Sequence, residues 1–306
     1  MSIKKKHLGN ITWIDLISPN IKDVRSLVDE HIIHPSLADE LVSPSLRPHT
    51  KYIDGAFFIA LHIPVVIQEK ERIRISNKEL DITITQDSLI TTRYSALDVM
   101  DNFSKFFETR SILNKSNHLS GTRLFSDLLT YIYKSIYDHL DQYRDSLRMC
   151  EEDIFDGAEK SMVRELSKTH QQLLRYDEAL RFHDDILQSF YEFHQDQGND
   201  EDMLLVEKLQ AEYERVTHGL EINMSYLHEL RDTNNSLLTI KQNNTIQLLT
   251  IMAYVSLPAS IIASTFGMNT LNMPIIGHEF DFWILVGIMT LMSLILFFFF
   301  KIKKWL

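Results

Sequence analysis

The sequence has one cysteine, Cys150, in 306 residues, which excludes a disulfide framework and a cysteine-rich metal cluster and fits a reducing compartment. Positive charge is also scarce, since 31 Lys and Arg stand against 42 Asp and Glu for a net charge of −11. An acidic surface repels the phosphates of nucleic acid and attracts cations, although solubility is the simpler reason for such a surface.

Charged residues are absent from two stretches near the C-terminus, 246–266 and 282–300. Each stretch has the length that a helix needs to cross roughly 30 Å of hydrocarbon. The first stretch also carries hydroxyl side chains and Pro258, and such groups suit a helix that faces protein or water better than one that faces lipid. The sequence therefore predicts two transmembrane helices with different surroundings.

Lysines flank these two spans on one side only. Lys241 precedes the first span, Lys301, Lys303 and Lys304 follow the second, and the connecting residues 267–281 contain no Lys or Arg. The positive-inside rule then places both termini in the cytoplasm and the loop outside. Residues 241–306 contribute +2 to the total of −11, so residues 1–240 carry −13. We expect an acidic cytoplasmic region and a multi-pass protein of the cytoplasmic (inner) membrane.

Residues 1–120 have the pattern of a cytoplasmic α/β domain with four or five strands and peripheral helices. The segment "ITWIDL" predicts a strand, and a helix capped by Ser18 is expected to follow it. Asp54-Gly55 is typical of a hairpin turn, and a second turn is expected around Asp87-Ser88. Proline is absent from residues 65–257, which leaves room for long uninterrupted helices.

Apolar residues recur at helical spacing from about Gly121, with an interruption at Gly157. A second helix is predicted over about 159–194. A third is predicted from Met203 without a break to Phe266, and its 64 residues would extend about 95 Å. Helices of this length suit coiled-coil-like packing against copies of themselves; several shorter helices are the alternative.

The predicted fold class is therefore an α+β membrane protein. Its expected parts are the α/β domain (1–120), a long-helix stalk (121–245), the first transmembrane helix (246–266), an extracytoplasmic loop (267–281), the second transmembrane helix (282–300) and a basic cytoplasmic tail (301–306).

A seam of small, polar or aliphatic residues follows the first span when one steps alternately by three and four from Asn243. Its members are Asn243, Ile246, Thr250, Ala253, Leu257, Ser260 and Ser264. Repeated around a symmetric ring, this seam would line a narrow pore. The alternative is a face of small residues that packs helices together without an ion path.

Neither span contains a carboxylate, so a passing cation would meet only hydroxyl, amide and carbonyl oxygens. Such a path suits an ion that gives up its water reluctantly, as Mg²⁺ does. The amide oxygen of Asn269 could accept hydrogen bonds from the water shell of the ion. Gly267 would let the backbone turn tightly where the helix leaves the membrane.

The motif Phe266-Gly267-Met268-Asn269, the helix "KQNNTIQLLTIMAYVSLPASIIAS", the ending "KIKKWL" and "TWIDL" resemble the CorA family of divalent metal ion channels, the two-transmembrane GxN superfamily. The resemblance implies a funnel-shaped homopentamer that admits Mg²⁺, Co²⁺ and Ni²⁺, with no organic cofactor. By position, it also implies roles for particular residues. These are a selectivity motif (Gly267, Met268, Asn269), a polar ring (Asn243), a hydrophobic gate (Ile246, Leu249, Leu257) and a basic collar (Lys301, Lys303, Lys304).

Two departures from the family pattern stand out. The loop reads Met273-Pro274-Ile275-Ile276 and lacks the usual acid, which Glu279 and Asp281 would partly replace. Family members are also inhibited by Mg²⁺ held between cytoplasmic acids, but Lys208 stands where one acid is expected. The candidates for a regulatory Mg²⁺ site are Glu69, Glu71, Glu207 and Glu212.

Other functions remain open at this stage. A zinc transporter of the same superfamily would use histidines such as His278, His31 or His34, which we interpret as surface residues. A membrane-tethered scaffold would be indifferent to Asn269→Ala. An enzyme is not expected, because Cys150 lacks an activating partner and His183, in "RFHDDI", is interpreted as a surface residue.

Overall fold

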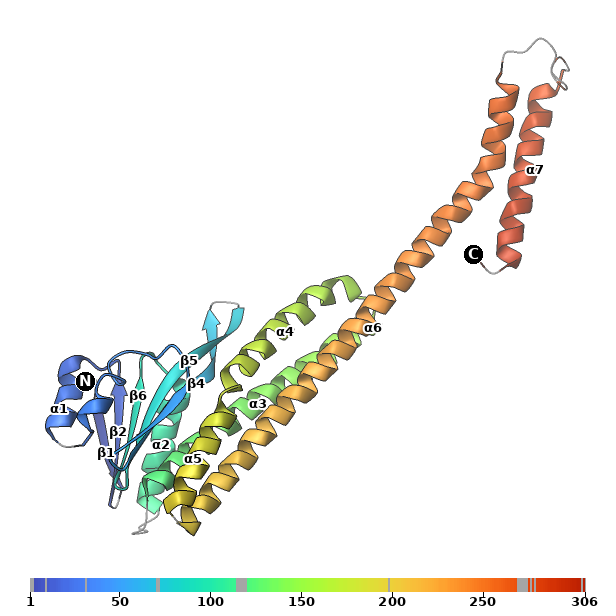
Figure 1. Ribbon diagram of the computed structural model, residues 1–306. Coiled ribbons are helices and arrows are strands. Elements are labelled where there is room, and N and C mark those ends of the chain that lie inside the picture. Colours follow the sequence, from blue (N-terminus) through green and yellow to red (C-terminus); the bar gives the residue numbers. More distant parts are fainter. Residues whose placement is uncertain are drawn as a thin grey trace. The chain divides into compact units, whose positions relative to one another are not determined.

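The computed structural model describes residues 3–8, 10–30, 32–69, 72–113, 120–197, 199–268, 275, 277, 279–303 and 305. The chain divides into two units, Met1–Arg231 and Asp232–Leu306 (Figure 1). Helix α6 (Asp200–Phe266) contributes to both.

A six-stranded sheet forms the N-terminal part of the first unit, with the strand order β1-β2-β6-β5-β4-β3. Its strands are β1 (Ile3–Leu8), β2 (Ile11–Ile17), β3 (His49–Ile53), β4 (Ala56–Glu69), β5 (Arg72–Ile84) and β6 (Ser88–Arg93). Only the β2–β6 pair is parallel. The sequence predicted four or five strands; the lysine-rich edge strand β1 had no apolar alternation to reveal it.

The turn at Asp54-Gly55 is confirmed. Both residues have positive φ, 47° and 80°, as the mirror-image turns of hairpins require. The predicted cap of the first helix is wrong by two residues. Helix α1 (Ile21–Asp29) is capped by Asn20, whose side chain accepts hydrogen bonds from the backbone N–H of Lys22 and Asp23. Ser18 instead has φ of 47° and makes the turn after β2.

The sheet is covered on both faces (Figure 1). One face buries Phe58, Ala60 and Ile90 against α1 and the 3₁₀ turn η1 (Pro35–Leu37). On the other face, the Trp13 ring lies 5.4 Å from that of Phe103 in α2 (Asp98–Leu113), centroid to centroid. These two layers place the core on either side of the sheet.

The helical region follows as α3 (Gly121–Phe155), α4 (Glu159–Leu180), α5 (His183–Gln197) and α6. The interruption at Gly157 is confirmed, with φ of 98°. The single helix expected over 159–194 is wrong, because α4 ends at Leu180 and α5 begins at His183. The unbroken third helix is confirmed, and it begins at Asp200.

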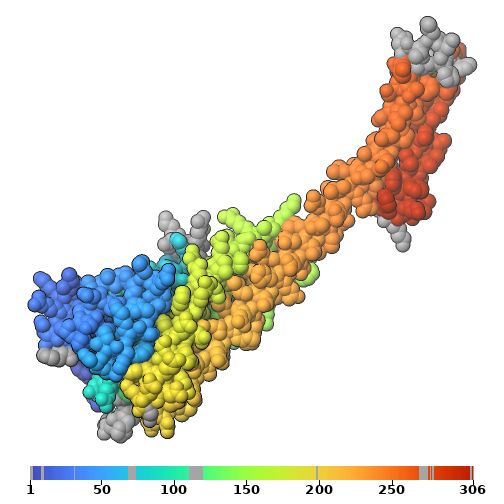
Figure 2. Space-filling model, in the orientation of Figure 1, coloured from blue at the N-terminus to red at the C-terminus, as the bar shows by residue number. Residues whose placement is uncertain are grey.

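The second unit is a helical hairpin of the end of α6 and α7 (Asp281–Ile302). Both helices are long and apolar enough to cross a membrane by length and composition. Figure 2 shows their side chains in contact. Pro258 lies inside α6 and cannot donate a backbone hydrogen bond to Tyr254.

Candidate functional site: one face of a membrane helix

One face of α6 packs on α7. The less exposed positions of α6 here include Ile251, Val255 and Ile262, and those of α7 recur every three or four residues. The α7 positions are Leu285, Met289, Ser293, Leu296 and Phe300. Ser293 Oγ donates to the carbonyl oxygen of Val255 at 3.1 Å, which ties the two helices together near their middle.

The predicted pore-lining residues lie on a different face. All eight of them, Asn243, Ile246, Leu249, Thr250, Ala253, Leu257, Ser260 and Ser264, are exposed. Because a helix turns by about 100° per residue, Val255 lies about 200° from both Ala253 and Leu257. The predicted seam therefore points away from α7, and the hairpin leaves it open to other contacts.

Two hydroxyl groups on this face, those of Thr250 and Ser260, donate their hydrogens to backbone carbonyl oxygens of the same helix. Thr250 Oγ1 donates to the carbonyl oxygen of Ile246 at 2.7 Å, and Ser260 Oγ donates to that of Ser256 at 3.2 Å. A hydroxyl in this state presents only oxygen lone pairs outward. Since the water shell of a cation points hydrogens outward, these two positions are suited to accept from a hydrated cation.

The end of α6 corrects the role expected for Gly267. Its φ lies outside the left-handed region, so it is not needed for a tight turn. A Cβ atom at this position would lie 2.9 Å from the carbonyl oxygen of Ala263, to which the Gly267 N–H already donates at 2.9 Å. Glycine is required here for a close backbone approach. Met268 is exposed, and Asn269 lies outside the described residues.

The loop acid Asp281 has a structural task. Its carboxylate accepts from the backbone N–H of Phe282 at 2.6 Å and from that of Gly277 at 3.3 Å. A negative charge at a helix N-terminus is stabilised by these groups and by the helix dipole. Glu279 is exposed and is the better placed of the two acids to attract cations; Met273, Pro274, Ile276 and His278 lie outside the described residues.

The basic end of the chain folds back on α6. Lys301 and Lys303 are exposed at the end of α7, and Lys304 lies outside the described residues. Trp305 stacks on Phe300, with 5.8 Å between ring centroids, and its carbonyl oxygen accepts from Gln247 Nε2 at 2.9 Å. Sequence reasoning missed this role of Gln247, although a lone amide near the start of an apolar run was its signal.

The structure describes the side chains of two of the four predicted regulatory acids, Glu207 and Glu212. On α6, Glu207 is exposed and Glu212 half-buried. The side chain of Glu69 and all of Glu71 lie outside the described residues. Within the described part of this single chain, no three His, Cys, Asp or Glu side chains form a group that could hold a metal ion. The regulatory site stays a prediction.

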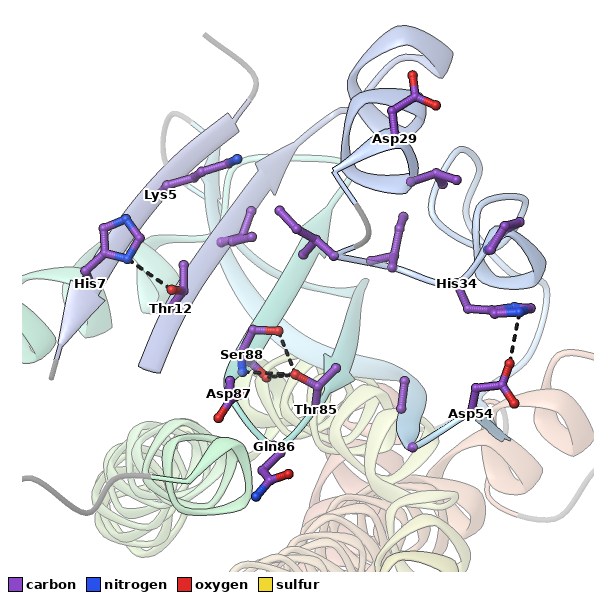
Figure 3. A pocket seen from close by; sticks show the side chains of 17 residues that line it. Lys5, His7, Thr12, Asp29, His34, Asp54, Thr85, Gln86, Asp87 and Ser88 are labelled. Carbon is purple, nitrogen blue, oxygen red and sulfur yellow. Dashed lines mark hydrogen bonds and ion pairs between the residues drawn. The ribbon is translucent and has the colours of Figure 1, made fainter. Parts of the chain in front are cut away.

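A separate cavity of about 1030 Å³ lies in the α/β domain (Figure 3). His34 in its wall donates from Nε2 to Asp54 Oδ2 across 3.0 Å, and its Nδ1 accepts from Ser36 N–H at 3.2 Å. His7 and Thr12 form a second pair at 3.0 Å. His34 therefore holds the turn at Asp54 in place, and His31 lies outside the described residues.

His183, interpreted from the sequence as a surface residue, is fully buried. Its Nε2 donates to the carbonyl oxygen of His62 at 2.8 Å, so its Nδ1 accepts from Tyr133 Oη at 3.0 Å. Burial lowers the pKa of His183 to about 4. Burial also raises the pKa of the Cys150 thiol, which disfavours its reactive thiolate form.

Residues 9–303 match the family described as CorA-like Mg²⁺ transporter protein. The chain belongs to this family. Among curated proteins, the cobalt/magnesium transport protein CorA of Thermotoga maritima is 23% identical over 305 residues, which cover 96% of this chain and 83% of that protein. The expected family resemblance is thereby confirmed.

Solved structures support the same fold class. The CorA magnesium transporter of Methanocaldococcus jannaschii aligns with a TM-score of 0.82 at 18% identity and covers 97% of this chain and 92% of its own. The ZntB cytoplasmic domain of Vibrio parahaemolyticus aligns with a TM-score of 0.54 at 15% identity, covering 76% of this chain and 90% of its own. The predicted α/β domain, long helix and two C-terminal apolar helices are confirmed.

Proposed function

We propose that this CorA-family chain mediates influx of Mg²⁺, and also of Co²⁺ and Ni²⁺, across the cytoplasmic membrane as a homo-oligomer, with five copies as the expected number. The observation that carries the proposal is the seam on α6, which faces away from α7 and offers acceptor oxygens without a carboxylate. Several copies of this face around one axis would form a wet path.

The ion would pass with most of its water. An amide ring of Asn269 at the outer mouth, following Gly267 and Met268, would accept from the first water shell, and Thr250 and Ser260 would do the same deeper in the path. Ile246, Leu249 and Leu257 would form the hydrophobic gate, because a narrow apolar collar closes by excluding water. Asn243 would make the inner polar ring.

Both termini would lie in the cytoplasm, with Lys301, Lys303 and Lys304 around the inner mouth. The support is the placement of lysines on one side of the two spans. Cytoplasmic Mg²⁺ would act on the acidic first unit as a regulatory ion as well as the transported one, and no organic cofactor is required. Partners other than copies of the chain, lipid and divalent cations are not proposed, and neither is enzymatic activity.

Zinc is the second candidate ion, because the fold of a ZntB cytoplasmic domain is similar to part of this chain. Zinc prefers nitrogen and sulfur ligands, whereas the proposed path presents oxygen. This chemistry favours Mg²⁺. A membrane-tethered scaffold without an ion path is the third candidate.

Ion flux into vesicles that contain the purified full chain tests the proposal, with Mg²⁺, Co²⁺, Ni²⁺ and Zn²⁺ compared side by side. We expect Mg²⁺ influx, and we expect Asn269→Ala to lose transport or selectivity while the size of the assembly is unchanged. Asn235→Ala, at an exposed position of α6 within the first few turns of the second unit, is the matched control. Flux of Zn²⁺ alone would favour the zinc transporter, and no flux of any ion would favour the scaffold.

A further inference from the structure

Two carboxyl groups lie side by side in the α/β domain. Glu79 and Asp81 are two residues apart on β5 and therefore on the same face of the sheet. In the register of β4 they stand opposite His62 and Ala60, and Ala60 belongs to the core beneath α1. Asp81 is 0% exposed, and the Glu79 side chain is 6% exposed.

These two buried carboxyl groups lie on the same face of the strand, where a hydrogen bond between them would form if one of them carried a proton. Two ionised carboxylates could only accept hydrogen bonds and would repel each other, so their proximity favours a proton on one of them. Asp81 Oδ1 is buried and has no hydrogen-bond partner among the described residues. A proton on Asp81 would satisfy this oxygen and supply the bond to Glu79.

The groups around the pair indicate that the proton is on Asp81 and not on Glu79. Glu79 already accepts from Ser45 N–H at 2.6 Å and lies 3.6 Å from His62 Nε2. Burial raises the pKa of Glu79, but the nearby His62 imidazole, the Ser45 N–H and Asp81 together bring it below the usual value. Burial, with the charge of Glu79, raises the pKa of Asp81 to about 9.

Tyr94 connects the pair to a neighbouring segment. Its hydroxyl lies 2.6 Å from Asp81 Oδ2 and 3.0 Å from the carbonyl oxygen of Glu40. The Glu40 side chain faces Lys51 and His49 instead, with which it forms ion pairs. Glu40 and Ser45 therefore mark the two ends of a segment, residues 40–45, that is fastened to the sheet through Tyr94, Asp81 and Glu79.

We propose that Glu79 and Asp81 share one proton in the folded protein, and that this proton fastens residues 40–45 to the sheet as an alkali-sensitive latch. Its loss places two negative charges side by side in the interior, where, among the described residues, the basic group beside the pair is His62, 3.6 Å from Glu79. The repulsion is relieved when the segment opens and water enters. The latch is a property of the α/β domain and does not depend on ion transport.

Hydrogen–deuterium exchange of the full chain in detergent, corrected for the intrinsic effect of pH, tests the latch. We expect residues 40–45 to be protected at about pH 7 and to exchange up to about a hundredfold faster at about pH 10. The opening equilibrium changes about tenfold for each of the two pH units between pH 7 and the Asp81 pKa of about 9. Asp81→Asn keeps the shape and cannot ionise, so its exchange should stay slow at both pH values. Asp87→Asn, at an exposed turn after the same strand, should behave as the unchanged protein.

Glu79→Gln gives an independent result if Asp81→Asn does not fold. Without the neighbouring charge the pKa of Asp81 falls, so the loss of protection should move to lower pH. An infrared band of a protonated carboxyl group that disappears between about pH 7 and about pH 10, and is missing in Asp81→Asn, would identify the proton directly. An unchanged pH profile in Asp81→Asn, or no such band, would overturn the proposal.

Discussion

Gly121 begins α3 at a point where no side chain fits. A Cβ atom here would lie 2.0 Å from the carbonyl oxygen of Thr85, in the turn after β5, and 3.0 Å from that of Ser88, the first residue of β6. Gly121→Ala must push the helix away from the sheet, and we expect it to lower the free energy of unfolding by about 1–3 kcal/mol. Denaturant unfolding of the full chain in detergent measures this.

The matched control is Gly287→Ala in α7, where a Cβ would meet no atom of the described residues within 4 Å. Alanine is also the better helix former, so this variant should be as stable as the unchanged chain. Equal stability of Gly121→Ala would mean that the start of α3 is not held against the turn.

We expect the buried His183 to lower the stability of the folded protein in acid. Its folded-state pKa is about 4, against 6.5 for an ordinary histidine, so protonation favours the unfolded chain. This contribution is fully present above about pH 6.5 and is lost as the pH falls towards about 4, by at most about 1.4 kcal/mol per pH unit. We expect a lower melting temperature at about pH 5 than at about pH 7, and a smaller difference in His183→Gln.

The glutamine variant keeps a donor for the carbonyl oxygen of His62 and has no charge to gain. His218→Gln, at an exposed position of α6 paired with Glu221, is the control and should keep the full pH dependence. If His183→Gln kept it as well, another group would be responsible for the acid sensitivity.

Predictions about single residues succeeded where the backbone conformation of the residue itself decides the outcome. They failed where contacts with residues distant in the sequence decide it. Asp54-Gly55 and Gly157 follow from backbone conformations that few residues adopt. His183 gave no such signal, because its burial depends on Tyr133 and His62, which are distant in the sequence. The proton between Glu79 and Asp81 was unpredictable for the same reason, since Tyr94 and Ser45 complete it.

At the scale of single elements, the two faces of α6 predict different chemical access. The native cysteine is first removed by Cys150→Ser. In that chain, Ser260→Cys and Ser264→Cys each place a thiol on the seam, and Phe298→Cys places one on exposed α7. A charged thiol reagent needs water to reach its target and to find a thiolate. We expect the two seam thiols to react in membranes and the α7 thiol to remain unmodified.

Reaction of all three thiols at the same rate would contradict a wet seam beside a lipid-facing α7. Inert seam thiols would favour the face of small residues that packs helices together. The same variants then distinguish an ion path from a packing surface without any measurement of transport.

Helix lengths were predictable from the sequence to different degrees. The long α6 was predicted because only Gly219 interrupts its helical pattern before the apolar run. Tyr137 packs against this glycine, and a Cβ atom at position 219 would lie 3.2 Å from Tyr137 Cε2. The break between α4 and α5 was not predicted, since neither proline nor glycine marks residues 181–182. Strand β1 carries Lys4, Lys5 and Lys6 and is an edge strand, where charge is expected but a strand is hard to recognise.

For the whole molecule, the single chain gives one wall of the proposed path. A narrow pore needs the same face from several copies, and closed rotational symmetry is the usual way to provide it. The expected number of copies rests on the family resemblance, because the described residues of a single chain do not show how many copies assemble. The motif after α6 was recognisable from the sequence, whereas the geometry of a ring of Asn269 residues belongs to the assembly.

The acidic first unit leads to the last prediction, that cytoplasmic Mg²⁺ stabilises the assembly. Acids from neighbouring copies repel one another, and a divalent cation between them removes the repulsion and adds oxygen ligands. Limited proteolysis of the full chain should therefore slow as Mg²⁺ is raised into the millimolar range. Glu207→Gln with Glu212→Gln should weaken the protection, while Glu221→Gln, at an exposed position of the same helix, should not. Proteolysis that does not depend on Mg²⁺ would contradict the regulatory site. The flux experiment could still succeed, since the proposed path, residues 243–264 of α6, contains none of these acids.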